Sequence, residues 1–236
     1  MTTRSIEHLQ ETIGYRFRKP ELLIEALTHS SYASESSGRP KNNEQLEFLG
    51  DAVLGFVVSS KLADAFPDCP EGKLSRARSR LVATEALSEA AGRLGLGDYL
   101  RLGHGEEKTG GRAKSRLAVD ALEALVAAIY RDGGVRAARR FILHFILPAD
   151  LKAAKDLLFA VDYKSALQEH LQAGRLGAAS YHIVSESGPE HRKTFTVEVS
   201  ACGRAAHGRG ASKKIAEQDA ARQCLMLLER SFPVNG

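Results

Sequence analysis

The sequence predicts an all-α domain followed by a small α+β domain with the element order αβββα. Up to about residue 150, apolar residues recur at the three- and four-residue spacing of helices, and prolines and glycines separate the segments. From residue 161 the pattern changes to one helix, then segments that alternate apolar and polar residues, then a last helix. Residues 151–160 are charged and rich in alanine, which indicates a linker. We therefore expect a helical domain over 1–150 and an αβββα domain over 161–231.

The helices of the first domain are bounded by recognisable signals. Pro20 suits the first position of a helix, and Asn42 or Asn43 can cap the next long one. Pro67 and Pro70 then interrupt the chain, and Asp132-Gly133-Gly134 indicates a turn. The predicted helices cover 6–13, 21–26, 44–65, a segment beginning at 71, 83–94, 117–129 and 135–146.

The second domain is predicted to open with a helix over 162–172. Residues 181–186 and 193–199 alternate as strands do, with a turn over 188–191 between them. A third short strand is expected near Ala205, and the stretch 208–221 leads into the last helix.

Composition limits the function classes. The chain has 236 residues, 43% of them hydrophobic, a net charge of +4 and a pI of about 9.0, which permits binding to nucleic acid without proving it. Cys69, Cys202 and Cys224 are far apart, which argues against a disulfide framework or a zinc site and suits a reducing cytoplasm. The N-terminus lacks an apolar signal core, and no apolar stretch is long enough to span a membrane. We expect a cytoplasmic protein that has no membrane partner.

The first acidic helix, over 44–65, carries three carboxylates on one face. Glu47 and Asp51 are four residues apart and Glu44 lies one turn earlier, while Leu54 and Val58 continue the same face. Like charges on a partly apolar face repel one another and lose hydration, and a bound cation resolves both problems. The alternative is an amphipathic helix whose outer face is simply acidic.

A second acidic helix favours the cation. Asp120 and Glu123 are three residues apart, on the face that also carries Ala124 and Ala127. These small residues allow another helix to approach closely. Two acidic pairs on two packed helices are what a divalent-metal site in a helical bundle requires, and oxygen ligands indicate Mg²⁺ or Mn²⁺ rather than zinc.

Two stretches resemble ribonuclease III. NEQLEFLGDAVLG is similar to that family's signature NERLEFLGDSxL, with Gln45 in place of the usual Arg, and LAVDALEALVAAIY is similar to its second acidic segment. The THSSY and EGKLSRARSRLV blocks match as well. The resemblance implies Mg²⁺-dependent hydrolysis of double-stranded RNA, with Mn²⁺ as a substitute and no small-molecule cofactor, leaving 5′-phosphate and 3′-hydroxyl ends. Ribosomal RNA precursors and structured transcripts are the implied substrates.

The resemblance also implies roles for four carboxylates. Glu47, Asp120 and Glu123 would hold metal, while Asp51 would complete the ligand set or orient the attacking water. Asp51 and Glu123 are accordingly the expected catalytic residues. The metal would lower the pKa of water and stabilise charge in the transition state.

The second domain resembles a double-stranded RNA-binding domain. The resemblance rests on the αβββα order, on GPEH in the first hairpin and on GxSKKxAEQxAA at the last helix. Such a domain reads shape, phosphates and 2′-hydroxyls, because A-form RNA hides its base edges in a deep groove. Lys213 and Lys214 at a helix N-terminus suit a phosphate. The residues expected to reach minor grooves are Gln168, Glu169, Gln172 and His191.

A homodimer is expected, since one acidic cluster hydrolyses one phosphodiester at a time and a duplex has two strands. Phe48 lies off the carboxylate face, and the resemblance makes it an aromatic knob that inserts into the partner subunit. The alternative for Phe48 is ordinary core. For the whole chain, the alternative function is a catalytically inactive dimer that binds double-stranded RNA.

Three features remain open between structural and functional interpretations. His29 is either a catalytic residue or a hydrogen-bonded structural histidine. The arginines and lysine of 73–80 form either a solvated basic face or phosphate contacts, and the glycine-rich basic stretch 105–116 is either a connector or an RNA contact.

Overall fold

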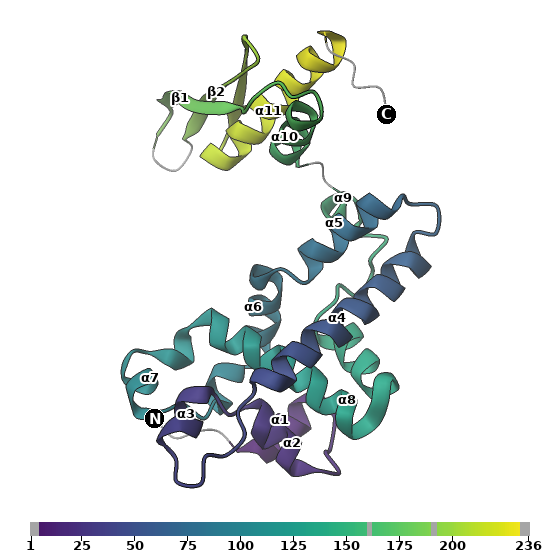
Figure 1. Ribbon diagram of the computed structural model, residues 1–236, viewed down its shortest axis with the longest axis vertical. Helices are drawn as coiled ribbons and strands as arrows, with labels where there is room; N and C mark the ends of the chain where they lie inside the picture. Colours follow the sequence, from purple (N-terminus) through teal and green to yellow (C-terminus); the bar gives the residue numbers. More distant parts are fainter. Residues whose placement is uncertain (1–4, 160–161, 190–192, 232–236) are drawn as a thin grey trace. The chain divides into compact units, whose positions relative to one another are not determined.

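The computed structural model describes residues 5–159, 162–189 and 193–231, and the chain divides into two units at residue 160. The first unit is helical and the second has the order αβββα (Figure 1). The helices of the first unit, with two 3₁₀ turns η1 and η2, are α1 (Ile6–Ile13), α2 (Pro20–Ala26), α3 (Ser30–Glu35), α4 (Glu44–Ala65), α5 (Glu71–Leu81), α6 (Thr84–Arg93), η1 (Leu96–Tyr99), α7 (His104–Lys108), η2 (Gly111–Ala113), α8 (Ser115–Phe145) and α9 (Lys155–Leu158). The predicted fold class is thereby confirmed. None of the described helices is both long and apolar enough to cross a lipid bilayer.

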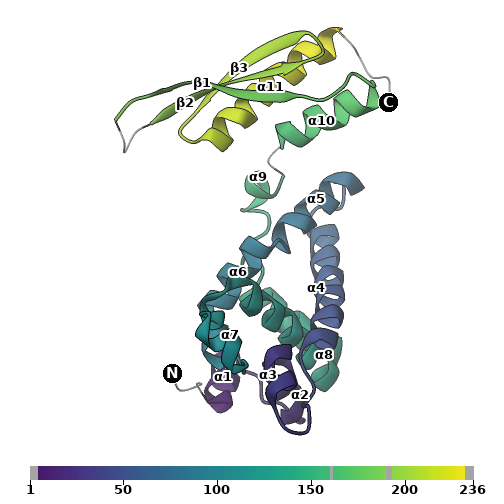
Figure 2. The same cartoon turned by 60° about the vertical axis from the view of Figure 1, so that its left-hand side comes forward.

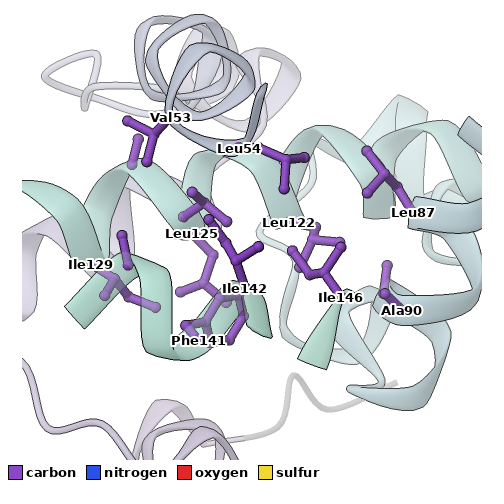
Figure 3. Packing of buried hydrophobic residues seen from close by; sticks show 14 of the residues in the cluster. Val53, Leu54, Leu87, Ala90, Leu122, Leu125, Ile129, Phe141, Ile142 and Ile146 are labelled. Atoms are coloured by element: carbon purple, nitrogen blue, oxygen red, sulfur yellow. The ribbon is translucent and has the colours of Figure 1, made fainter. Parts of the chain in front are cut away.

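The core of the helical unit forms where α4 packs along α8, with α6 beside them. Val53 and Leu54 of α4 join Leu122 and Leu125 of α8 and Leu87 of α6 in one buried cluster (Figure 3). All five are at most 8% exposed. This apolar contact holds the acid-bearing faces of α4 and α8 next to each other.

Helix α8 is interrupted at Gly134, where φ is 74° and ψ is −178°. The backbone is helical on both sides of this residue, so a single left-handed glycine takes the place of the turn that the sequence predicts at 132–134. Beyond the break, Phe141 and Ile142 pack into the same core cluster as Leu125 (Figure 3). Asp132, just before the break, accepts hydrogen bonds from the Tyr15 hydroxyl at 2.7 Å and from the Lys19 backbone N–H at 3.0 Å. The chain between α1 and α2 is thus fastened to α8.

The segment 151–159, where the sequence indicates a linker, is packed onto the helical unit. It contains α9, and Leu151 and Leu158 belong to the helical core. Arg80 donates to the Leu158 carbonyl at 2.9 Å, and the rings of Phe66 and Phe159 meet edge to face with centroids 4.9 Å apart. Residues 151–159 therefore belong to the helical unit.

The second unit is a three-stranded antiparallel sheet with two helices on one face (Figure 2). Its elements are α10 (Tyr163–Ala173), β1 (Ser180–Ser187), β2 (Thr194–Ala201), β3 (Arg204–Gly210) and α11 (Lys213–Ser231), with strand order β1-β2-β3. Val197 and Val199 of β2 face the helices and are buried, together with Leu167 and Leu171 of α10. Gln218 of α11 joins the two helices by accepting from the Tyr163 backbone N–H at 2.7 Å.

Candidate active site

The site is built where α4 and α8 come into backbone contact. A Cβ atom placed on Gly50 would lie only 1.8 Å from the carbonyl oxygen of Glu123, so any larger residue would force the two helices apart. Gly50 sits between Glu47 and Asp51, two of the acidic residues of α4. Its close contact with Glu123 sets these acids opposite the acids of α8.

Three of the four expected carboxylates converge. The side chains of Glu47, Asp120 and Glu123 each offer an oxygen, and these oxygens all lie within 4.8 Å of one another. All three residues are half-buried. A set of three hard oxygen donors from two rigid helices fits a divalent cation of the Mg²⁺ or Mn²⁺ type. Asp51 is exposed and lies beside this trio rather than in it.

The electrostatics of the site follow from burial and like charge. Burial, with added repulsion from Asp51, Glu47 and Asp120, raises the pKa of Glu123 to about 7. Burial followed by the charge of Asp120 raises the pKa of Glu47, and burial also raises the pKa of Asp120. Although Asp51 is outside the converging trio, it makes the largest contribution of any carboxylate to the Glu123 shift.

His29 has a structural role in this fold. It caps α3: its Nδ1 accepts from the Ser31 backbone N–H at 3.2 Å and lies 2.8 Å from Ser31 Oγ. Ser31 Oγ in turn accepts from the Gly103 N–H at 2.9 Å. These bonds tie the α3 end of the chain to the loop before α7 and support the structural interpretation of His29.

The glycine-rich stretch 105–116 is largely fastened to its own domain. Arg112 pairs with Glu107 at 2.7 Å and also donates to the Gly97 carbonyl at 3.1 Å. Lys114 pairs with Glu106 at 2.5 Å. Two of its basic side chains thus serve to shape the loop. On the basic helix α5, Lys73, Arg76 and Arg78 are exposed, as a phosphate contact requires.

The expected RNA-contacting residues of the second unit occupy two places. Gln168, Glu169 and Gln172 are all exposed on α10. Lys213 and Lys214 are exposed at the start of α11. His191 lies outside the described residues.

Lys213 has an acidic neighbour that the sequence did not point out. Its Nζ is 3.6 Å from the carboxylate of Glu186 at the end of β1, and it lies 5.8 Å from the centroid of the Phe195 ring. These contacts orient the Lys213 side chain without burying it, since 58% of it is exposed. Two residues of the AEQ motif are structural: Glu217 pairs with Lys164 at 2.7 Å, and Gln218 bonds to the start of α10.

Phe48 is on the surface of the single chain. Its side chain is 81% exposed, so it is not part of the subunit core. A shallow pocket of about 430 Å³ adjoins it, lined also by Glu44, Gln45, Leu49 and Arg131. Phe56, two turns further along α4, is 63% exposed. Two large aromatic side chains of α4 are thus exposed on the single chain.

Two residues of the site escaped the sequence analysis. Gly50 was overlooked because only the distance to Glu123 shows that it is a helix contact, although a glycine between two acids in a long helix was a signal. The sequence predicts Arg116 at the end of a basic loop, whereas in the structure it lies in the first turn of α8, 4.0 Å from Asp120. Its spacing of four residues from Asp120 was the available signal.

Comparison with known proteins agrees with this geometry. Residues 19–150 match the family model described as ribonuclease-III-like, and residues 163–228 match the double-stranded RNA binding motif. The chain is 51% identical to ribonuclease 3 of Solibacter usitatus, over 91% of this chain and 83% of that protein. It is 44% identical to ribonuclease 3 of Syntrophotalea carbinolica, over 97% and 99% of the two chains.

A solved structure is similar to the helical unit. It is the nuclease domain of ribonuclease III from Campylobacter jejuni, with 37% identity and a TM-score of 0.57, covering 66% of this chain and all of that one. The family model spans more than half of the chain, and the relatives are matched over most of their length. The chain therefore belongs to the ribonuclease III family.

Proposed function

We propose that this protein is an endoribonuclease that hydrolyses double-stranded RNA at the α4–α8 site, with Mg²⁺ held by Glu47, Asp120 and Glu123. The observation that carries the proposal is the convergence of these three carboxylates within 4.8 Å, in a chain that also has a double-stranded RNA binding motif. The ends left would be 5′-phosphate and 3′-hydroxyl. Ribosomal RNA precursors and structured transcripts are the proposed cellular substrates.

The donor set suits the proposed cofactor. Oxygen-only ligands favour Mg²⁺ and accept Mn²⁺. When bound, a divalent cation lowers the pKa of water and offsets the charge that develops on the phosphate. Burial first, and then the neighbouring carboxylates, raise the pKa of Glu123 to about 7, an environment that a divalent cation would neutralise.

The protein residues position the reactants. Glu47, Asp120 and Glu123 lie on two helices that Gly50 holds in contact, so their oxygens keep a fixed spacing. Asp51 is exposed next to them, which leaves its carboxylate available to accept a hydrogen bond from the attacking water and orient it. We propose that Asp51 either completes the metal ligand set or orients the attacking water.

The second domain supplies duplex affinity. Lys213 and Lys214 add positive charge to the free N–H groups at the start of α11, which favours phosphate. Gln168, Glu169 and Gln172 form an exposed polar face on α10 that suits 2′-hydroxyls in a minor groove. His191 is proposed to reach a second groove.

A homodimer completes the proposal. Phe48 projects from α4 next to a pocket, so the same surface offers both a knob and a place for one, as a two-fold interface requires. The Campylobacter jejuni structure is described as having a region involved in dimer formation of the nuclease domain. Each subunit would cut one strand of the duplex. The inactive-dimer alternative has no support from these residues, because a protein that only binds a polyanion gains nothing from converging carboxylates.

The test is cleavage of a long RNA duplex by purified protein with Mg²⁺ or with chelator, followed by sizing of the products. Glu123→Gln should abolish cleavage yet retain duplex binding, since it removes one charge from the site and leaves the second domain unchanged. Near-normal cleavage by this variant at millimolar Mg²⁺ would remove Glu123 from the proposed site.

A further inference from the structure

One basic side chain approaches the acidic trio from its own helix. Arg116 Nε lies 4.0 Å from Asp120 Oδ2, one turn further along α8. The Asp120 side chain is 19% exposed, whereas the Arg116 side chain is 85% exposed. The carboxylate is therefore fixed, and the guanidinium is free to approach it or leave it.

Without its contact to Asp120, a cationic side chain at position 116 would be electrostatically unfavourable. It lies in the first turn of α8, whose free backbone N–H groups repel positive charge and favour acids. That first turn contains no acidic residue. The nearby basic side chains are used elsewhere: Lys114 pairs with Glu106, and Arg112 pairs with Glu107. The acidic trio is the feature of the fold that offsets this unfavourable placement.

The effect of Arg116 extends beyond its own partner. Its positive charge attracts the carboxylates of both Asp120 and Glu47. Glu47 is on α4 and Asp120 on α8, so one guanidinium acts on the acids of both helices. A divalent cation held by the same oxygens would do the same more strongly.

We propose that Arg116 is the built-in counter-ion of the metal-free site: its guanidinium pairs with Asp120 when no cation is bound, and it must leave when one binds. This inference rests on the proposed metal site and adds to it a competing cationic side chain that lowers the affinity for metal. Arg116 would thus affect metal binding indirectly, through its ion pair with Asp120, and would not itself contact the metal.

The expected size of the effect is modest. An exposed ion pair of this geometry contributes little in water and is weakened by salt. Losing such a competitor should tighten metal binding by roughly two- to five-fold at low ionic strength, and by less at high ionic strength.

The experiment measures Mn²⁺ and Mg²⁺ binding to the full-length protein without RNA, by calorimetry at low and high ionic strength. Arg116→Gln removes the charge and keeps most of the length, while Arg116→Lys keeps the charge. The matched control is Arg140→Gln, an exposed arginine beyond the Gly134 break of the same helix. Glu123→Gln reports on the metal site itself.

The expected result is a two- to five-fold lower Kd for Arg116→Gln at low ionic strength, nearly wild-type values for Arg116→Lys and Arg140→Gln, and a smaller difference at high ionic strength. Equal or weaker metal binding by Arg116→Gln at low ionic strength would overturn the competition and leave the metal site standing, provided that Glu123→Gln loses binding. If Glu123→Gln binds metal like the wild type, the metal site is wrong and the role of Arg116 falls with it.

Discussion

Metal binding at the α4–α8 site should release a proton whose amount depends on pH near neutrality. Burial and the charges of Asp51, Glu47 and Asp120 raise the pKa of Glu123 from its ordinary 4.5 to about 7. Ligation requires the ionised carboxylate, so the proton on Glu123 must leave when a cation binds. This provides a direct measure of the electrostatics that the structure predicts.

The magnitude follows from that pKa. With a value of about 7, the metal-free protein carries about 0.9 proton on Glu123 at pH 6, about 0.5 at pH 7 and about 0.1 at pH 8, and metal binding should release these amounts. The Kd for the metal should rise about tenfold for each pH unit below 7 and level off above it. The pKa of Glu123 is higher in the folded protein than in the unfolded chain. Its contribution to the free energy of unfolding of the metal-free protein is therefore fully present below about pH 4.5 and is lost as the pH rises through about 7.

The assay is calorimetric titration of Mn²⁺ at pH 6, 7 and 8 in buffers with different ionisation enthalpies, which yields the number of protons released. Asp51→Asn should shift the whole curve to lower pH, because Asp51 is the largest carboxylate contributor to the Glu123 shift. Glu123→Gln should weaken binding and remove this release. Proton release that stays constant from pH 6 to pH 8 in the wild type would refute the reasoning.

Four further predictions address the rest of the molecule. Removing residues from 161 onward should weaken duplex binding yet preserve cleavage at low salt, and a folded truncated chain that is inactive at every salt concentration would place catalytic groups in the second domain. Lys213→Ala with Lys214→Ala should lower affinity for all duplexes alike and reduce the salt slope by about one per lysine; losses confined to particular sequences would contradict phosphate contacts. A mixed dimer with one Glu123→Gln subunit, isolated with two affinity tags, should nick duplexes without severing them, as native and denaturing gels would reveal; severed duplex from single encounters would exclude one strand per subunit. Gly50→Ala should cost about 1–3 kcal/mol in denaturant unfolding, because its Cβ meets the Glu123 backbone, and an unchanged midpoint would mean that the helices separate freely.

The long elements could be predicted from the sequence because their signals are local. The helix expected over 44–65 and the observed α4 have the same bounds, since the segment lies between an asparagine cap region and the proline that follows Phe66. Strand β2 follows the alternation of buried Val197 and Val199 with polar neighbours. In such segments, local periodicity and tertiary burial favour the same structure.

The elements that the sequence missed depend on distant contacts. Helix α3 has His29 as its N-cap residue, and its six residues are too few to show a helical period. Helix α9 forms in a charged, alanine-rich stretch because Leu158 enters the helical core and its carbonyl accepts from Arg80. No sequence pattern within residues 151–160 predicts either contact.

The site shows the same division between local and distant information. The sequence predicts four site carboxylates, of which three converge, but spacing along two helices did not reveal that Asp51 lies outside the converging trio, or that Gly50 brings the helices together. Those facts depend on the rotation of α4 against α8. Once the acids converge, their repulsion has to be relieved: Glu123 holds a proton near neutral pH, and Arg116 lies beside Asp120. A metal ion entering the proposed site would displace both, so we expect pH and ionic strength to tune its affinity through two different residues.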